Sequence, residues 1–268
     1  MCPDEPDGGD GTDGDSPVSR FTGEYPHDFE IWTECYDSSR EVEMLRDRLS
    51  LTNARLLDAG CGAGRLAFRL ASDCGEIVGV DVQRPLIDLC RSRMSSEDRG
   101  RVSFEVADAA DLPFEDDAFD VALDAWLLSS LDDPAPVAEE YSRVVADGGQ
   151  IAVIVERSGS EYEEVLRQAG PRFGYDTGGI ESFLTDHFGS PLAADDIVAP
   201  YIYRSLDEAY DAFDFHFEEW LNVSLGDERR EAVREQIREH RWDSHVRLHE
   251  YARVYVFQNN RVEPRDDA

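Results

Sequence analysis

Lysine is absent from this 268-residue chain: its 26 basic residues are all Arg, and they face 59 acidic residues, so the formal net charge is −33. A field this negative repels phosphate backbones, which argues against a nucleic-acid partner. The acids are dispersed over every segment, as in the proteins of extreme halophiles, whose cytoplasm holds molar salt. There the screening length falls to roughly 3 Å, so self-repulsion is largely removed and the argument against RNA weakens. We therefore interpret the acidity as an adaptation to brine rather than as a surface for a basic partner.

Long apolar runs and paired cysteines are also missing. No apolar stretch approaches ~18 residues, so no membrane span is expected. The N-terminus (Met1–Glu5) lacks the basic start and apolar run of a secretory signal, which predicts a soluble cytoplasmic protein. The five cysteines include no CxxC pair, which favours reduced thiols over a disulfide framework or a metal site. Cys61, Cys74 and Cys90 lie in apolar surroundings and are expected in the core.

The pattern of apolar residues divides the chain into three parts. Residues 1–20, rich in Gly and Asp, are predicted to be a disordered acidic tail, because they have little to bury. Residues 21–258 are expected to form one domain, and residues 259–268 a C-terminal tail. Within the domain, residues 28–49 carry apolar side chains at helical spacing.

Residues 50–156 alternate between strand and helix. Strands are expected at 55–58, 76–82, 102–107, 119–125 and 150–155, and helices at 66–72, 85–94 and 136–145. Short links between such units predict a parallel sheet with helices on both faces, an α/β fold. The C-terminal part is less regular, with helices expected at 162–169, 181–188, 206–221 and 227–241 and strands at 196–203 and 245–257.

The first expected strand runs into a glycine loop, Leu56-Leu57-Asp58-Ala59-Gly60-Cys61-Gly62-Ala63-Gly64-Arg65. Glycine allows backbone to approach a ligand closely, and the helix that follows presents its positive end to negative charge. The spacing is GxGxG, not the GxGxxG of dinucleotide sites, and no GK[ST] follows as in a P-loop. The loop therefore indicates a nucleotide-type ligand and disfavours an NAD dehydrogenase.

Two acids follow expected strands at the same edge of the sheet. Asp81 ends the second strand, where a carboxylate can accept hydrogen bonds from ribose hydroxyls; a helix cap or turn acid is the alternative. Asp108 directly follows the third strand and begins the run Asp108–Val121 (DAADLPFEDDAFDV). The alternative for Asp108 is again a turn acid.

These motifs resemble those of class I S-adenosylmethionine-dependent methyltransferases, in the small-molecule branch with the ubiquinone and menaquinone biosynthesis C-methyltransferases. That family has a DxGxGxG loop, an acid ending strand two, D-A-x-x-L-P-F-x-D-x-x-F-D-x-V, and E-x-x-R-V-L-x-P-G-G before strand five. The resemblance covers roughly residues 50–156 and leaves 157–268 uncovered. The departures are Val145 for Leu and Asp147 for Pro. The matching segments, in order, are Asp58–Gly64, Asp81, Asp108–Val121 and Glu140–Gly149.

The resemblance implies a Rossmann-like, seven-stranded, mostly parallel sheet with helices on both faces. Its last strand would run antiparallel and is expected at 245–257. A helical cap, at about 205–243, would be inserted before that strand and cover the acceptor.

The resemblance also implies roles around the methionine half of the cofactor. Gly60, Gly62 and Gly64 would lie under the methionine. Asp58 would orient the loop or contact the methionine amine, and Ala125 would offer its backbone.

The resemblance implies that the two later acids bind the adenosine half of the cofactor. Asp81 would hold the ribose, and Asp108, with the backbone of Ala109, would face the adenine. No metal site is expected.

The acceptor side is less defined. His216 is a weak candidate for a general base, and a packed histidine is the alternative. Trp126 could wall the methyl-transfer site or belong to the core. A lid could be formed by Tyr25, Trp32 and Tyr36, or these residues could pack an amphipathic helix on the sheet.

Residues 201–220 are dense in aromatics. Phe213, Phe217 and Trp220 share one helical face, which predicts either core packing or the wall of a pocket for an aromatic or prenyl-like acceptor. His216 and Tyr203 would then be polar contacts.

The function expected from these features is S-adenosylmethionine-dependent methyl transfer to a small organic acceptor. A sulfonium methyl is already activated, so the protein mainly aligns the nucleophile and excludes water. The alternatives are methylation of RNA or protein by the same fold, and a non-catalytic, cofactor-binding partner subunit.

The charge generates a first prediction. Raising KCl from low to molar concentration should raise the melting temperature, because salt screens the repulsion among dispersed acids. Thermal melts followed by circular dichroism over a KCl series test this. A melting temperature that is flat or falls across the series contradicts the halophilic interpretation.

Overall fold

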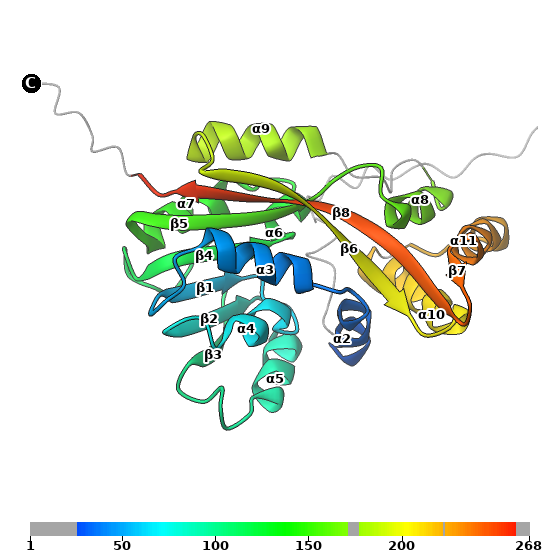
Figure 1. Ribbon diagram of the computed structural model, residues 1–268, viewed down its shortest axis with the longest axis horizontal. Helices are drawn as coiled ribbons and strands as arrows, with labels where there is room; N and C mark the ends of the chain where they lie inside the picture. The colour runs from blue at the N-terminus through cyan, green and yellow to red at the C-terminus, as the bar shows by residue number, and fades with distance from the viewer. Residues whose placement is uncertain (1–25, 171–176, 222, 261–268) are drawn as a thin grey trace, which may run out of the picture.

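The computed structural model describes residues 26–170, 177–221 and 223–260. Its sheet has the strand order β3-β2-β1-β4-β5-β8-β6, and a short strand, β7, pairs with β8 outside this path (Figure 1). β1 to β5 are parallel, whereas β8 runs antiparallel to both β5 and β6. The predicted mostly parallel sheet with an antiparallel last strand is therefore confirmed. The strands are β1 (Arg55–Ala59), β2 (Glu76–Asp81), β3 (Val102–Val106), β4 (Phe119–Ala125), β5 (Val145–Glu156), β6 (Ala193–Tyr203), β7 (Arg241–Trp242) and β8 (His245–Gln258).

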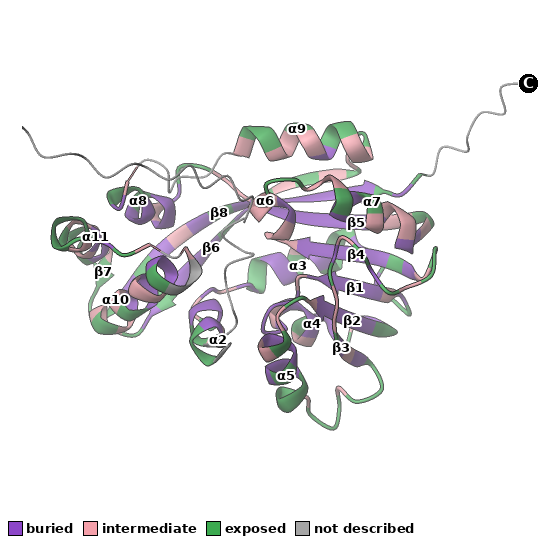
Figure 2. Cartoon of the chain, turned by 180° about the vertical axis from the view of Figure 1, so that it is seen from behind, coloured by how far each residue is buried: buried purple, intermediate pink, exposed green. Residues whose placement is uncertain are grey.

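Helices cover both faces of the sheet, as predicted (Figures 1 and 2). One face packs against α3 (Ser39–Arg48), α4 (Arg65–Leu70) and α5 (Arg84–Arg93). The other packs against α6 (Leu127–Ser130), α7 (Ala135–Val144) and α9 (Thr177–Phe188). Cover on both sides explains why β1, β2 and β4 are nearly continuous apolar runs. Cys61, Cys74 and Cys90 are buried here, as predicted.

The far ends of β6 and β8 extend past the parallel strands as a two-stranded ribbon (Figure 1). There β8 alternates between buried and exposed residues, because only one side is covered. The cover is a second cluster of buried side chains. Helices between β6 and β8 thus lie where the cap was expected, and their role over an acceptor stays a prediction. The cluster includes α2 (Pro26–Glu34), α8 (Glu161–Gln168), α10 (Leu206–Phe215), the π-helix η2 (His216–Trp220) and α11 (Asp227–Glu239).

Two helix predictions need correction. Residues 28–49 form two helices, because residues 35–37 pair with the edge of β6. Asp37 N–H donates to Pro200 O (2.9 Å), and Ile202 N–H donates to Cys35 O (2.7 Å). Residues 206–221 do not form one regular helix, because α10 continues into the π-helix η2. At the other end, Asn259 is buried and its side chain donates to Val145 O (2.7 Å), so ordered chain extends into the segment predicted as a tail.

Side chains of α7 explain two of the sequence motifs. Arg143 donates to the carbonyls of Leu112 and Phe114 and to Glu140, and Glu140 in turn accepts from the Leu112 N–H (2.7 Å). The Glu140–Arg143 pair therefore fixes the loop that begins at Asp108. Arg143 also holds the pKa of Glu140 below its usual range.

A buried carboxylate connects β4 to α6 and α7. Asp124 accepts from the N–H groups of Leu127 and Leu128 and from the Tyr141 hydroxyl (2.7 Å). Burial raises its pKa to about 7.

No described helix is long and apolar enough to cross a membrane.

This network generates a second prediction. Tyr141→Phe should lower the free energy of unfolding by about 1–3 kcal/mol, because Asp124 loses a buried donor. The control is Tyr251→Phe, which removes the hydroxyl of a tyrosine that is 37% exposed; it should change stability by no more than about 0.5 kcal/mol. Urea unfolding in molar KCl measures both. Equal effects of the two substitutions would contradict a stabilising role for the buried hydroxyl.

Candidate active site

One cavity of about 610 Å³ lies at the carboxyl ends of the central parallel strands. This volume is in the usual range of small-molecule sites, and such ends are where open α/β sheets bind ligands. The structure brings together at this cavity His216 and all the residues predicted to bind the cofactor except Gly64. Those that line it are Asp58, Gly60, Gly62, Asp81, Asp108, Ala109, Ala125 and His216.

The glycine loop forms a bare backbone floor. Gly60 and Gly62 have φ angles of +67° and +54°, which disfavour larger residues. A Cβ on Gly62 would lie 3.0 Å from the ring of Phe29, and one on Gly60 would lie 3.0 Å from Leu127. Gly64 instead begins α4 with φ of +79°, and the Phe68 ring leaves no room for a Cβ there.

Asp58 and Asp81 hold the loop from two strands. Asp58 is 3% exposed and accepts from the Ala67 N–H (3.1 Å), which ties β1 to α4. Burial raises the pKa of Asp58 to about 7. Asp81 accepts from the N–H groups of Gly62 (3.0 Å) and Gln83 (2.8 Å), and its burial also raises its pKa. Asp81 is thus both a turn acid and a cavity-lining acid.

Asp108 combines the same two features. It is exposed, and its carboxylate accepts from the Ala110 N–H (2.9 Å) in the turn after β3. Ala109 beside it is buried. Asp108 lies next to Asp81 at the sheet edge because β2 and β3 pair in parallel.

The floor and the two acids fit S-adenosylmethionine. Gly60 and Gly62 line the cavity with backbone alone, and carboxylates stand at the ends of β2 and β3, where the resemblance predicts contacts to ribose and adenine. Among the described residues no cluster of three or more potential metal ligands is present.

Beyond the glycine loop the wall contains an arginine between aromatic rings. The Arg65 guanidinium lies 4.5 Å from the Trp126 ring and 5.1 Å from the Tyr36 ring. It is paired with Glu41, which is fully buried and accepts from the Tyr36 hydroxyl (2.9 Å). Trp126 lines the cavity with a φ of +73°, and its Nε1 is buried without a hydrogen-bond partner among the described residues. Tyr36 therefore belongs to the core rather than to a lid, and Tyr25 lies outside the described residues.

A chain of three side chains lies on the ribbon side of the cavity. Trp32 Nε1–H donates to the Tyr162 hydroxyl (3.1 Å), which lies 3.2 Å from His216 Nδ1. Because the Tyr162 oxygen accepts from Trp32, its own hydrogen is free for Nδ1. Burial lowers the pKa of His216 to about 3. His216 is thus a neutral ring with one nitrogen already occupied, which argues against a role as general base.

The cavity also contains residues that the sequence reasoning missed. Tyr162, Glu156 and Glu250 all line it. Glu156 could have been found from its position at the end of a parallel strand, as Asp81 was. Tyr162 and Glu250 come from α8 and the ribbon, which no motif covers. Tyr201 also lines the cavity, and it lies in the aromatic segment 201–220, for which a pocket wall was one of the two predictions.

For the aromatic face of α10 and η2, the structure supports the first of the two predicted alternatives, core packing. Phe213 and Phe217 are each 1% exposed and pack in the core beneath the ribbon rather than along the cavity. Tyr203 is fully buried in the same cluster. The side chain of Trp220 lies outside the described residues.

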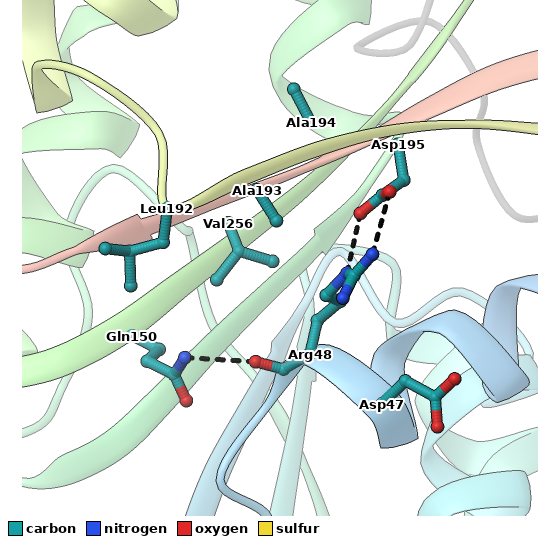
Figure 3. A pocket seen from close by; sticks show the side chains of 8 residues that line it. All are labelled: Asp47, Arg48, Gln150, Leu192, Ala193, Ala194, Asp195 and Val256. Atoms are coloured by element: carbon teal, nitrogen blue, oxygen red, sulfur yellow. Dashed lines mark hydrogen bonds and ion pairs between the residues drawn. The ribbon is translucent and has the colours of Figure 1, made fainter.

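A second hollow lies at the opposite end of the sheet, and its arginine is already held in an ion pair. Arg48 lines it, but its guanidinium is bound by both oxygens of Asp195, at 2.7 and 2.9 Å (Figure 3). The Arg48 carbonyl accepts from Gln150. These bonds attach α3 to β6 and β5.

The strand order, the glycine loop and the acids of β2 and β3 define a Rossmann-like methyltransferase fold. The YcgJ protein of Bacillus subtilis has this architecture: it matches 83% of this chain and 99% of its own, with a TM-score of 0.58 and 16% identity.

Sequence comparison finds similar proteins over part of the chain. Residues 51–170, less than half of the chain, match the family described as "methyltransferase domain". Methyltransferase GfsG of Streptomyces halstedii is 38% identical over 42% of this chain and 42% of its own length. Demethylmenaquinone methyltransferase of Clavibacter sepedonicus is 34% identical over 44% of this chain and 47% of its own. The chain thus matches less than half the length of these relatives.

The geometry of the acids generates a third prediction. Asp81→Ala should weaken S-adenosylhomocysteine binding by about 1.5–3 kcal/mol, through the loss of charge-assisted hydrogen bonds. Asp81→Asn keeps one acceptor oxygen and should lose less. Asp47→Ala removes an exposed acid of α3 at the other hollow and should leave affinity unchanged. Calorimetry in molar KCl measures all three. Wild-type affinity in Asp81→Ala would remove this carboxylate from the site.

Proposed function

We propose that this protein is an enzyme that transfers the methyl group of S-adenosylmethionine to a small organic acceptor. The observation that carries the proposal is one continuous cavity, in which the glycine floor and the acids of β2 and β3 continue into a chamber walled by Trp32, Tyr162 and Tyr201. Aromatic walls with a few polar groups among them are typical of small-molecule sites. The relatives named above, a demethylmenaquinone methyltransferase among them, support the same reading.

The mechanism requires alignment more than activation. The bound cofactor supplies a sulfonium methyl group, which is already electrophilic. The glycine backbone and Asp58 position the methionine half, and Asp81 and Asp108 position the adenosine half. The aromatic wall holds the acceptor in line with the sulfur–carbon bond and excludes water. This orientation of the acceptor supplies most of the rate enhancement.

The aromatic walls favour an aromatic or prenyl-like acceptor. Trp32, Tyr162 and Tyr201 line this part of the cavity, where Tyr162 also packs on Tyr201 at a ring-centroid distance of 4.3 Å. An aromatic cluster of this kind presents apolar surface to a ligand. RNA is disfavoured because Arg230, Arg234 and Arg238 of α11 are each paired with an acid and do not form a basic surface.

A labelling experiment provides the fourth prediction. The protein is incubated in molar KCl with methyl-labelled S-adenosylmethionine and either a small-molecule extract or purified RNA with protein. Label should pass into the small-molecule pool, because aromatic side chains line a chamber of small-molecule size. Gly62→Val serves as the inactive control, since its Cβ would collide with Phe29.

Transfer only to the macromolecular pool would contradict the proposal and favour the RNA or protein alternative. Normal cofactor binding with no transfer to either pool would favour the non-catalytic partner subunit.

A further inference from the structure

Another carboxylate of the cavity, Glu156, lies at the end of β5. It is the last residue of β5, two positions after Ile154, and Ile154 pairs with Ala125 at the end of β4. Ala125 and Trp126 form the part of the wall expected beside the methionine. Glu156 therefore stands at the same sheet edge, one strand further from the glycine loop, and it lines the same cavity.

The only side-chain partner that the structure gives Glu156 among the described residues can serve both of its protonation states. The Ser129 hydroxyl donates to Glu156 Oε2 at 2.9 Å, and its oxygen also lies 3.2 Å from the Trp126 carbonyl. When Glu156 is ionised, the serine hydrogen points to the carboxylate. When Glu156 is protonated, the acid donates to Ser129 Oγ and the serine hydrogen turns to the Trp126 carbonyl. Neither state leaves a buried polar group unsatisfied.

The charged surroundings of Glu156 do not fix its charge. Among the described residues no basic side chain forms an ion pair with it. Glu41 of α3 disfavours its ionised form, but Glu41 is itself paired with Arg65 of α4. Glu250 of β8 and His216 of η2 line the same cavity. Burial raises the pKa of Glu156 to about 7, where a carboxylate exchanges protons near neutral pH.

We propose that Glu156 is the general base of the reaction and that the acceptor carries an aromatic hydroxyl group. The proposal rests on the function proposed above. His216 is excluded from this role by its occupied Nδ1 and its lowered pKa. A hydroxyl must lose its proton to become a strong nucleophile, whereas a neutral amine is already one. A carboxylate that is not paired with a cation can accept the proton of a hydroxyl.

The step balances as follows. The acceptor hydroxyl gives its proton to Glu156, and its oxygen forms a bond to the methyl carbon. The sulfur–methyl bond breaks, and its electron pair stays on sulfur, so S-adenosylhomocysteine is the second product. The proton on Glu156 then leaves to solvent when the products depart.

The test compares wild type, Glu156→Gln and a control, Glu105→Gln, which removes an exposed acid from β3 at the far edge of the sheet. Calorimetry with S-adenosylhomocysteine comes first and should give equal affinities for all three. Loss of binding in the wild type would overturn the proposed function itself. Equal binding shows that any later difference concerns the acceptor step.

Transfer from labelled S-adenosylmethionine is then measured at about pH 8 with 2-naphthol, whose hydroxyl is still protonated there, and with 4-nitrophenol, which is largely ionised there. Glu156→Gln should lose roughly 10²- to 10⁴-fold in rate with 2-naphthol and much less with 4-nitrophenol. In the wild type and in Glu105→Gln, kcat/KM for 2-naphthol should rise with pH through about 7, as Glu156 ionises. The rise of kcat/KM with pH should be absent in Glu156→Gln. Glu156→Asp should keep this rise, with a lower rate than the wild type.

Three outcomes would overturn the proposal. One is a Glu156→Gln enzyme with the wild-type rate and pH profile on 2-naphthol. Another is a wild type that methylates 2-naphthylamine but not 2-naphthol, which would make the acceptor an amine. The third is normal cofactor binding without transfer to either naphthyl compound, which would reject the aromatic hydroxyl while leaving the cofactor site intact.

Discussion

The parallel pairing of β1 with β2 and β4, and of β4 with β5, is the constraint on which the site depends. In this arrangement the carboxyl ends of the parallel strands lie at the same edge of the sheet. Residues that are far apart in the sequence therefore come close together there. Asp58, Asp81, Ala125 and Glu156 are such strand-end residues. The antiparallel β8 then extends the sheet in the opposite direction and supplies, with β6, the ribbon that closes the remaining side of the cavity.

The chemistry of the site depends on carboxylates held away from water. Asp58, Asp124 and Glu156 all have pKa values raised to about 7 by burial. Each therefore binds a proton more readily in the folded chain than in the unfolded one. Their contribution to stability is present at acid pH and is lost as the pH rises from about 4 to 7. Surface acids paired with arginine, such as Asp195 and Asp196, have lowered pKa values and act in the opposite direction.

The sequence was sufficient for the features that local patterns and the family motifs determine. The alternation of strands and helices predicted the parallel sheet, and the glycine spacing with Asp81 and Asp108 predicted the cofactor half of the cavity. It was insufficient where tertiary contacts override local periodicity. Residues 28–49 look like one helix, but the pairing of residues 35–37 with β6 divides it. Phe213 and Phe217 share a helical face that could have met a ligand, yet the ribbon that buries them is formed by strands distant in sequence. Glu156 was missed because a strand-end acid has no motif of its own.

The position of α2 has a consequence for the order of events at the site. Phe29 lies against Gly62 under the cofactor half, and one turn later Trp32 stands in the acceptor wall. The same short helix is attached to the edge of β6 through Cys35 and Asp37. Both ends of the cavity are therefore lined by side chains of one short helix. A substitution that shifted α2 would alter both ends together, so the two halves of the site are not structurally independent.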